Sequence, residues 1–120
     1  MNKLVIIILS LFSTKNVLAN NETDFRNFIE HCNAGAYAKE QYCPNLDITM
    51  PMVCNALAIH TLPAHDRAKG RGVVMSIDTL ANQYTVDNYF INKAGAEQNE
   101  LCADYLNEYK NTYQQLFNKL

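Results

Sequence analysis

The chain has 120 residues, of which 48 % are hydrophobic and 18 % charged, with four cysteines and no tryptophan. This hydrophobic content excludes an intrinsically disordered chain. Of the 10 Lys and Arg, two precede residue 20, whereas all 12 Asp and Glu follow it, so residues 20–120 carry a net charge of −4. A mildly acidic domain is a poor candidate for general binding to nucleic acid or to an anionic membrane, because both depend on clustered positive charge.

The start of the chain has the pattern of a signal peptide. Lys3 precedes the apolar run of residues 4–12, and residues 17–19 are small or aliphatic, as a signal peptidase requires at its cleavage site. The apolar run is about half as long as a membrane-spanning helix. We therefore expect a signal peptide at residues 1–19 and a single domain at residues 20–120, periplasmic or secreted and free of the membrane after cleavage. An uncleaved N-terminal anchor is the alternative.

Apolar residues recur at helical spacing through the rest of the chain, and Pro and Gly fall between the periodic segments. The pattern predicts an all-α fold, a small disulfide-stapled bundle of four to five helices. The expected helices, in chain order, span residues 24–42 (with Thr23 as N-cap), 51–62, 73–84, 85–94 and 96–120. Val53, Leu57, Leu80, Tyr84 and Ile91 are expected on the buried sides of these helices.

The last predicted helix has the clearest stripe of apolar residues, which step by three or four along it: Cys102, Tyr105, Tyr109, Tyr113, Leu116 and Leu120. Three tyrosines on one face are typical of a core. Because tyrosine is also favoured at interfaces, a docking surface is the alternative.

Four cysteines in an exported domain indicate two disulfides. If the second helix starts near Pro51, Cys54 is level with Cys43, whereas Cys32 lies about 16 Å away along the helix axis, at about 1.5 Å per residue. A disulfide needs Cα atoms within about 7 Å of each other. We therefore favour Cys43–Cys54 with Cys32–Cys102, and keep Cys32–Cys54 with Cys43–Cys102 as an open alternative.

No sequence pattern favours an enzyme. The chain contains no glycine-rich phosphate loop, nucleophile elbow or closely spaced acidic pair in apolar surroundings. His60, His65 and Asp66 are candidate metal ligands, but Pro63 lies between the histidines and no further ligand is evident. We therefore expect no catalytic residue, no metal and no cofactor. A small hydrolase or metal-dependent enzyme that uses these three residues is the alternative.

Residues 64–72 contain three cations, two glycines and no large apolar side chain. This composition predicts an exposed loop or a frayed helical lead-in, and loops on rigid scaffolds commonly carry binding residues. We expect the polar side chains of this segment to contact a protein partner, with the cations facing an acidic groove: His65, Asp66, Arg67, Lys69 and Arg71. A solvated connector is the alternative.

One cysteine lies on the early amphipathic helix, and another lies near the start of the long last helix. The first helix contains Phe25, Phe28, Ile29 and Cys32 followed by Ala34-Gly35-Ala36-Tyr37, and the last contains Leu101-Cys102. This layout resembles that of the periplasmic immunity proteins that neutralise type VI secreted amidases. The resemblance implies an all-helical inhibitor that inserts a loop into a cell-wall hydrolase, and a homodimer is one arrangement that it allows.

The expected function is therefore that of a periplasmic, non-enzymatic binding protein. Its partner would be a secreted amidase or another cell-wall hydrolase, which it blocks as an inhibitor or immunity protein. A second hypothesis is an accessory subunit or chaperone of an export, pilus or conjugation machine, docking through the last helix.

Overall fold

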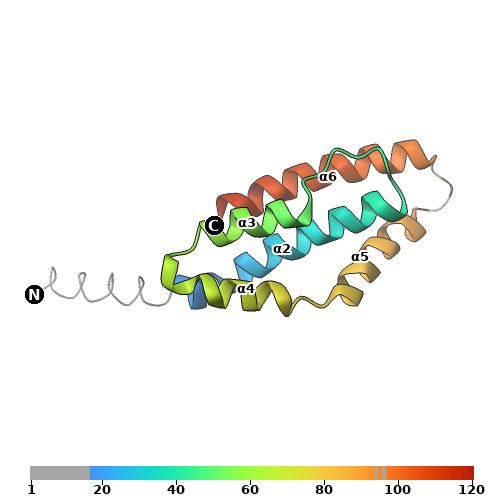
Figure 1. Ribbon diagram of the computed structural model, residues 1–120. Coiled ribbons are helices and arrows are strands. Elements are labelled where there is room, and N and C mark those ends of the chain that lie inside the picture. Colours follow the sequence, from blue (N-terminus) through green and yellow to red (C-terminus); the bar gives the residue numbers. More distant parts are fainter. Residues whose placement is uncertain (1–16, 94, 96) are drawn as a thin grey trace, which may run out of the picture.

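The computed structural model describes residues 17–93, 95 and 97–120, and these residues form five α-helices and one short 3-10 helix (Figure 1). The elements are α2 (Val17–Gln41), α3 (Pro51–His60), the 3-10 helix η1 (Ala64–Asp66), α4 (Arg67–Met75), α5 (Thr79–Asn92) and α6 (Gln98–Asn118). This part of the chain contains no strand, which confirms the predicted all-α, disulfide-stapled bundle. None of its helices is long and apolar enough to span a membrane. Most of the predicted signal peptide, residues 1–16, lies outside the described residues.

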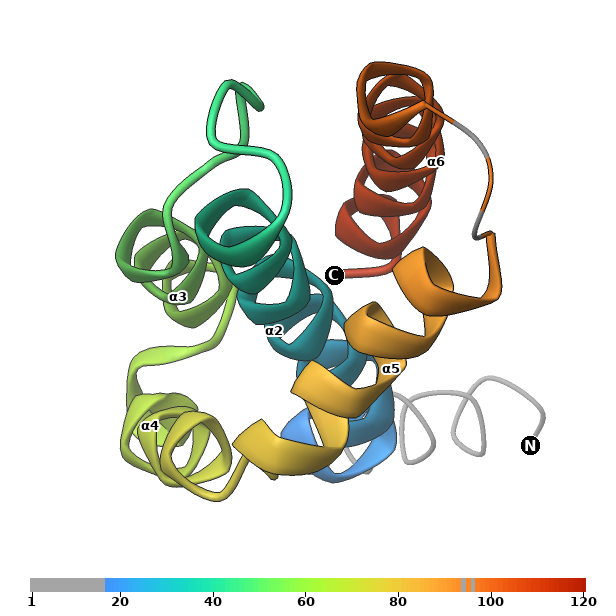
Figure 2. The ribbon, with the colours of Figure 1, turned by 90° about the vertical axis from the view of Figure 1, so that its right-hand side faces the viewer.

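Helix α2 is the centre of the bundle. In Figure 2 the helices α3, α4, α5 and α6 surround it, and each of them packs against it. Side chains along α2 at helical spacing are completely buried: Phe25, Phe28, Ile29, Cys32 and Ala38. The other helices therefore form a single outer layer around one central helix.

The buried side chains form two clusters along α2. The first lies between α2, α3 and α4 and includes Phe28, Cys54 and Val73. The second lies between the end of α2, the segment after it, α5 and α6, and it includes Phe90 and Tyr105. Each cluster contains at least one cysteine of a disulfide, so each half of the core is covalently closed.

The disulfides join Cys32 to Cys54 and Cys43 to Cys102. The favoured pairing, Cys43–Cys54 with Cys32–Cys102, is therefore wrong, and the alternative is confirmed. The reason is the path of residues 43–50, which run back along α2 so that α3 begins beside the middle of that helix (Figure 1). The Cα atoms of Cys32 and Cys54 are consequently 6.3 Å apart, and those of Cys43 and Cys102 are 5.8 Å apart.

A break at residues 76–78 separates α4 from α5, so the predicted helix over residues 73–84 is wrong. Ser76 Oγ donates to the carbonyl oxygen of Val73 at the end of α4 (2.8 Å). Asp78 is the N-cap of α5, and its side chain accepts a hydrogen bond from a backbone N–H of the first turn (3.0 Å). Ser and Asp side chains form hydrogen bonds with the free backbone groups at helix ends. The spacing of apolar residues gives no sign of such bonds.

The remaining helix boundaries follow the sequence with smaller differences. The second and last predicted helices are confirmed as α3 and α6, and the predicted helix over residues 85–94 is the second half of α5. The first predicted helix starts too late, because α2 begins at Val17 and already includes Thr23, the residue predicted to cap it.

Helix α6 comes very close to α2 at Gly35. A β-carbon at this position would overlap the ring of Tyr109, which lies directly over the glycine. At Gly72, in α4, a β-carbon would meet nothing within 4 Å apart from its own chain neighbours and the nearby backbone of the same helix. Close packing therefore requires a glycine at position 35 but not at position 72.

We predict that Gly35→Ala destabilises the protein, because overpacking of a dense core costs about 1–3 kcal/mol. Gly72→Ala is the matched control and is expected to stabilise it by about 0.5–1 kcal/mol, since alanine is the better helix former. Urea unfolding monitored by circular dichroism measures both changes. Equal effects of the two substitutions would show that Tyr109 does not pack on Gly35.

A second prediction concerns the disulfides. The variant Cys43→Ala/Cys102→Ala is expected to keep one bridge and to show no free thiol. The variant Cys43→Ala/Cys54→Ala is expected to show two free thiols, because its remaining cysteines, Cys32 and Cys102, are bonded to different partners in the structure. Thiol titration under denaturing, non-reducing conditions distinguishes the two variants. Free thiols in the first variant and none in the second would instead support the pairing Cys43–Cys54 with Cys32–Cys102.

Candidate binding site

The segment predicted to be an exposed loop or a frayed helical lead-in, residues 64–72, is helical and partly buried. It forms η1 and the first part of α4. Asp66 is only 5 % exposed, and Gly70 is buried so tightly that a β-carbon there would overlap the side chain of Leu62. The absence of large apolar side chains misled the sequence prediction, because here small residues allow α4 to pack closely.

The three cations of this segment do not form one cluster. Arg67 and Arg71 are four residues apart on α4 and share one flank. Lys69 lies two residues from each, so at about 100° per residue it faces the opposite flank. The structure thus brings the two arginines together, separates Lys69 from them and buries Asp66. Contact of these residues with an acidic groove stays a prediction.

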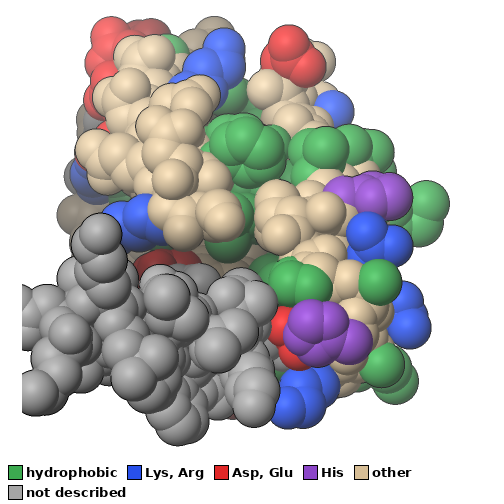
Figure 3. Space-filling view, turned by 90° about the vertical axis from the view of Figure 1, so that its left-hand side faces the viewer, with side chains coloured by type: hydrophobic (Ala, Val, Ile, Leu, Met, Phe, Trp, Pro, Cys, Tyr) green, Lys and Arg blue, Asp and Glu red, His purple; other side chains and the backbone are tan. Residues whose placement is uncertain are grey.

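The two histidines considered as metal ligands are exposed at this end of the molecule. His65 Nε2 lies 3.6 Å from Asp66 Oδ2, and His60 ends α3. Figure 3 shows histidine, Lys and Arg side chains along one margin of this face, next to hydrophobic side chains. Among the side chains that the structure describes, no group of three or more His, Cys, Asp or Glu is placed to hold a metal ion.

The outward side of α3 is apolar and exposed, whereas Cys54 and Ala58 on its other side are buried against α2. Val53 and Leu57, predicted to be buried, are 50 % and 39 % exposed. We call this surface the α3 face, and its residues are Met50, Met52, Val53 and Leu57. Of the helices in the described part of the chain, only α3 contains no Asp, Glu, Lys or Arg.

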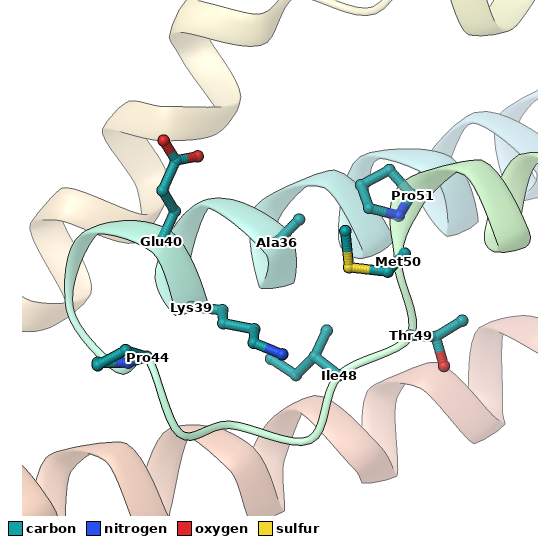
Figure 4. Close-up of a pocket in the computed structure, with 8 residues that line it drawn as sticks. All are labelled: Ala36, Lys39, Glu40, Pro44, Ile48, Thr49, Met50 and Pro51. Carbon is teal, nitrogen blue, oxygen red and sulfur yellow. The ribbon is translucent and has the colours of Figure 1, made fainter.

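A groove of about 610 Å³ opens beside the α3 face, between the end of α2 and the segment that leads to α3 (Figure 4). Its lining residues are mostly apolar: Ala36, Lys39, Glu40, Pro44, Ile48, Thr49, Met50 and Pro51. Met50 belongs both to the groove and to the α3 face. The two therefore form one continuous apolar surface.

One cation reaches into this groove. Figure 4 shows the side chain of Lys39 extending from α2 towards Ile48, while that of Glu40, which also lines the groove, points away from Lys39. Lys39 is half-buried and Glu40 is exposed. The ion pairs among the described side chains are Arg26–Glu22 and His65–Asp66, so the Lys39 ammonium has no carboxylate partner there.

The chain on one side of the groove is extended. Leu46 and Ile48 are buried, each 6 % exposed, while Asp47 between them faces solvent, which is the alternation of a strand. No hydrogen bond between described residues uses the backbone N–H or C=O groups of residues 47–49. This segment therefore presents an unpaired backbone edge beside the groove.

A tyrosine and carboxylate cluster ties α5 to the end of α2. Tyr37 and Tyr42 both donate to Asp87 Oδ1, at 2.8 Å and 2.6 Å. The hydrogen bond to this carboxylate raises the pKa of Tyr42 to about 12 and also raises the pKa of Tyr37. The cluster therefore fixes the position of α5 against the end of α2.

A second polar cluster lies inside the core. His31 Nε2 donates to the backbone oxygen of Tyr109 (2.9 Å), and its ring stacks on that of Tyr109. Burial lowers the pKa of His31, and the hydrogen bond partly offsets this. Burial also raises the pKa of Tyr105 to about 12 and raises the pKa of Tyr109. Tyr105 and Tyr109 are 9 % and 4 % exposed and belong to the core as predicted, whereas Tyr113 of the same stripe is partly buried.

Sequence reasoning gave no role to the α3 face, Lys39 or the edge at residues 47–49. One available signal was the lack of charge in Pro51–His60, because surface helices normally place charged residues on their outer side. Another was the alternation of apolar and polar residues from Leu46 to Ile48, which is a strand pattern within a predicted loop.

Comparison with protein families, with curated proteins and with solved structures found no match to this chain. The functional argument therefore depends on the residues and geometry described above.

We predict that stability falls between about pH 10 and about pH 12. Tyrosines whose pKa is raised in the folded state contribute stability that is fully present below their ordinary pKa of 10.0 and is lost as the pH rises through the folded pKa, about 12 for Tyr42 and Tyr105. Asp87→Asn is expected to reduce this alkaline loss and to lower the Tm near neutral pH, since it removes the charged acceptor.

The control is Asp104→Asn, an exposed carboxylate of α6 outside both clusters. Thermal melts across the alkaline range measure the effects. Identical pH profiles for the two variants would contradict the role of Asp87.

Proposed function

We propose that this chain is a non-enzymatic binding protein that docks a protein partner through the α3 face. The observation that carries the proposal is an uncharged surface helix with exposed Met52, Val53 and Leu57 on its outer side. Interface centres are depleted of charged residues and enriched in side chains such as methionine. A contiguous apolar surface on a small protein commonly marks an interaction site.

The compartment that we propose is the periplasm or the extracellular space. The four cysteines form two disulfides, and such bonds persist in oxidising compartments. The N-terminal pattern of one cation followed by a short apolar run supports export.

The partner that we propose is a secreted cell-wall hydrolase, such as an amidase, which this protein inhibits. The layout of the first and last helices supports this choice through its resemblance to amidase immunity proteins. Helix α4, which packs against α3, carries Arg67 and Arg71 on one flank. Such charge would speed association with an acidic cleft more than it would strengthen the final complex.

A second candidate function is favoured by α5. Leu80, Tyr84 and Ile91 are 72 %, 71 % and 64 % exposed, and at about 100° per residue they fall within about 40° of one another on that helix. A protein with two exposed apolar helix faces could join two neighbours, as an accessory subunit of an export, pilus or conjugation machine does.

The test uses purified wild-type protein and the secreted hydrolases encoded beside its gene. We predict that the wild type inhibits one of them in a peptidoglycan digestion assay. Leu57→Glu is expected to raise the inhibition constant at least about tenfold, because it buries a charge in the contact. Leu80→Glu places the same charge on α5 and is the matched control, expected to inhibit like the wild type.

A photoreactive residue at position 53 identifies what lies on the α3 face in cells. A crosslink to the inhibited hydrolase supports the proposal, and a crosslink to a second copy of the chain would assign this face to a homodimer instead. Loss of function with Leu80→Glu but not with Leu57→Glu would favour the accessory subunit. No inhibited hydrolase, together with no hydrolase crosslink, would contradict the proposed function.

A further inference from the structure

We infer that the groove beside α2 binds an extended peptide segment of the partner, in which an apolar side chain lies next to a carboxylate. The inference rests on the proposed function and names the chemistry of the partner at that site. Three independent observations carry it: the apolar lining, the unpaired backbone edge and the Lys39 side chain that reaches into the groove.

The apolar lining accommodates a side chain rather than a flat surface. The groove measures about 610 Å³, within the range of about 300–1,000 Å³ found for ligand sites. Ala36, Ile48, Met50 and Pro51 provide apolar walls on both sides of it. An aliphatic or aromatic side chain of the partner that enters here would leave water and would continue the contact made by the α3 face.

The backbone edge selects an extended ligand. Residues 47–49 have a strand-like alternation of side chains, and their N–H and C=O groups bond to no other described residue. An extended peptide laid along such an edge forms main-chain hydrogen bonds with it, while its alternate side chains enter pockets. A helix could not use this edge, because its own backbone groups are already paired.

The charge selects an acidic ligand. Lys39 extends into the groove, and Glu40, which also lines it, points away from the Lys39 ammonium (Figure 4). No carboxylate of the described chain pairs with Lys39. A carboxylate on the ligand would form a charge-assisted hydrogen bond with this ammonium in a partly apolar setting, where such bonds are strong. Charge complementarity thus favours an acidic side chain or a C-terminal carboxylate beside the apolar residue.

The experiment selects peptides from a random displayed library on the purified, oxidised protein and then measures synthetic versions of the selected sequences. We expect these peptides to share an acidic residue next to an apolar one. Lys39→Met is expected to weaken their binding about tenfold, and Lys39→Arg to restore most of it. Lys110→Met, an exposed lysine of α6, is the control and is expected to have no effect.

Two further measurements test the mode of binding. Replacing the acidic residue of the peptide by its amide is expected to weaken binding to the wild type but not to Lys39→Met, as a direct pair requires. Hydrogen exchange by NMR is expected to slow at the amides of residues 47–49 when the peptide binds. If Lys39 had only a structural role, the amide substitution in the peptide would weaken binding to the wild type and to Lys39→Met by the same factor. Peptide binding would then also leave the exchange at residues 47–49 unchanged.

The inference is overturned if no peptide is selected, if binding is insensitive to Lys39→Met, or if the amides of residues 47–49 exchange as before. Oleate is the competing ligand: stronger, Lys39-dependent binding of oleate without slowed exchange would assign the groove to a lipid carboxylate and would also overturn it. The hydrolase assay with Leu57→Glu is separate. Inhibition that depends on Leu57 without peptide binding in the groove would leave the proposed function standing and would remove only this inference.

Discussion

The packing of four helices around α2 is the constraint on which the rest of the structure depends. A helix covered by α3, α4, α5 and α6 can accept them only where its side chains leave room, and Gly35 does this for α6 by letting the ring of Tyr109 lie directly on the backbone. Each outer helix has one side against α2 and one side away from it. The apolar outer sides of α3 and α5 follow from this arrangement, because no further layer of the described residues covers them.

The position of α3 on α2 is fixed by the segment that precedes it. Because residues 43–50 run back along α2 in an extended path, α3 starts beside the middle of the central helix and Cys54 meets Cys32. The same path places Cys43 where it bonds to Cys102 of α6. It also creates the space between the segment and α2 that forms the groove. The disulfide pairing and the candidate binding surface thus have one structural cause.

The sequence predicted the features that depend on neighbours three or four residues away. The stripe of α6 that contains Tyr105 and Tyr109 repeats at helical spacing, so its burial could be predicted from the pattern alone. The break at residues 76–78 could not, because capping by Asp78 overrides an uninterrupted apolar period. The pairing of Cys32 with Cys54 depends on the direction of a connecting segment, which no local spacing determines. The groove could be predicted even less well, since it forms only where Lys39 of α2 and the extended backbone of residues 47–49 come together in the folded chain.

Residues 44–53 lie between two cysteines that are each bonded to another part of the molecule, Cys43 to α6 and Cys54 to α2. A chain segment held covalently at both ends has few conformations left to lose, so little ordering entropy opposes the arrival of a ligand. Differences in affinity among ligands of such a rigid surface arise mainly in their dissociation rates, because encounter with a preformed shape is similar for all of them. In the proposed complex, the two bonds that close the core would therefore also influence how long the partner stays bound.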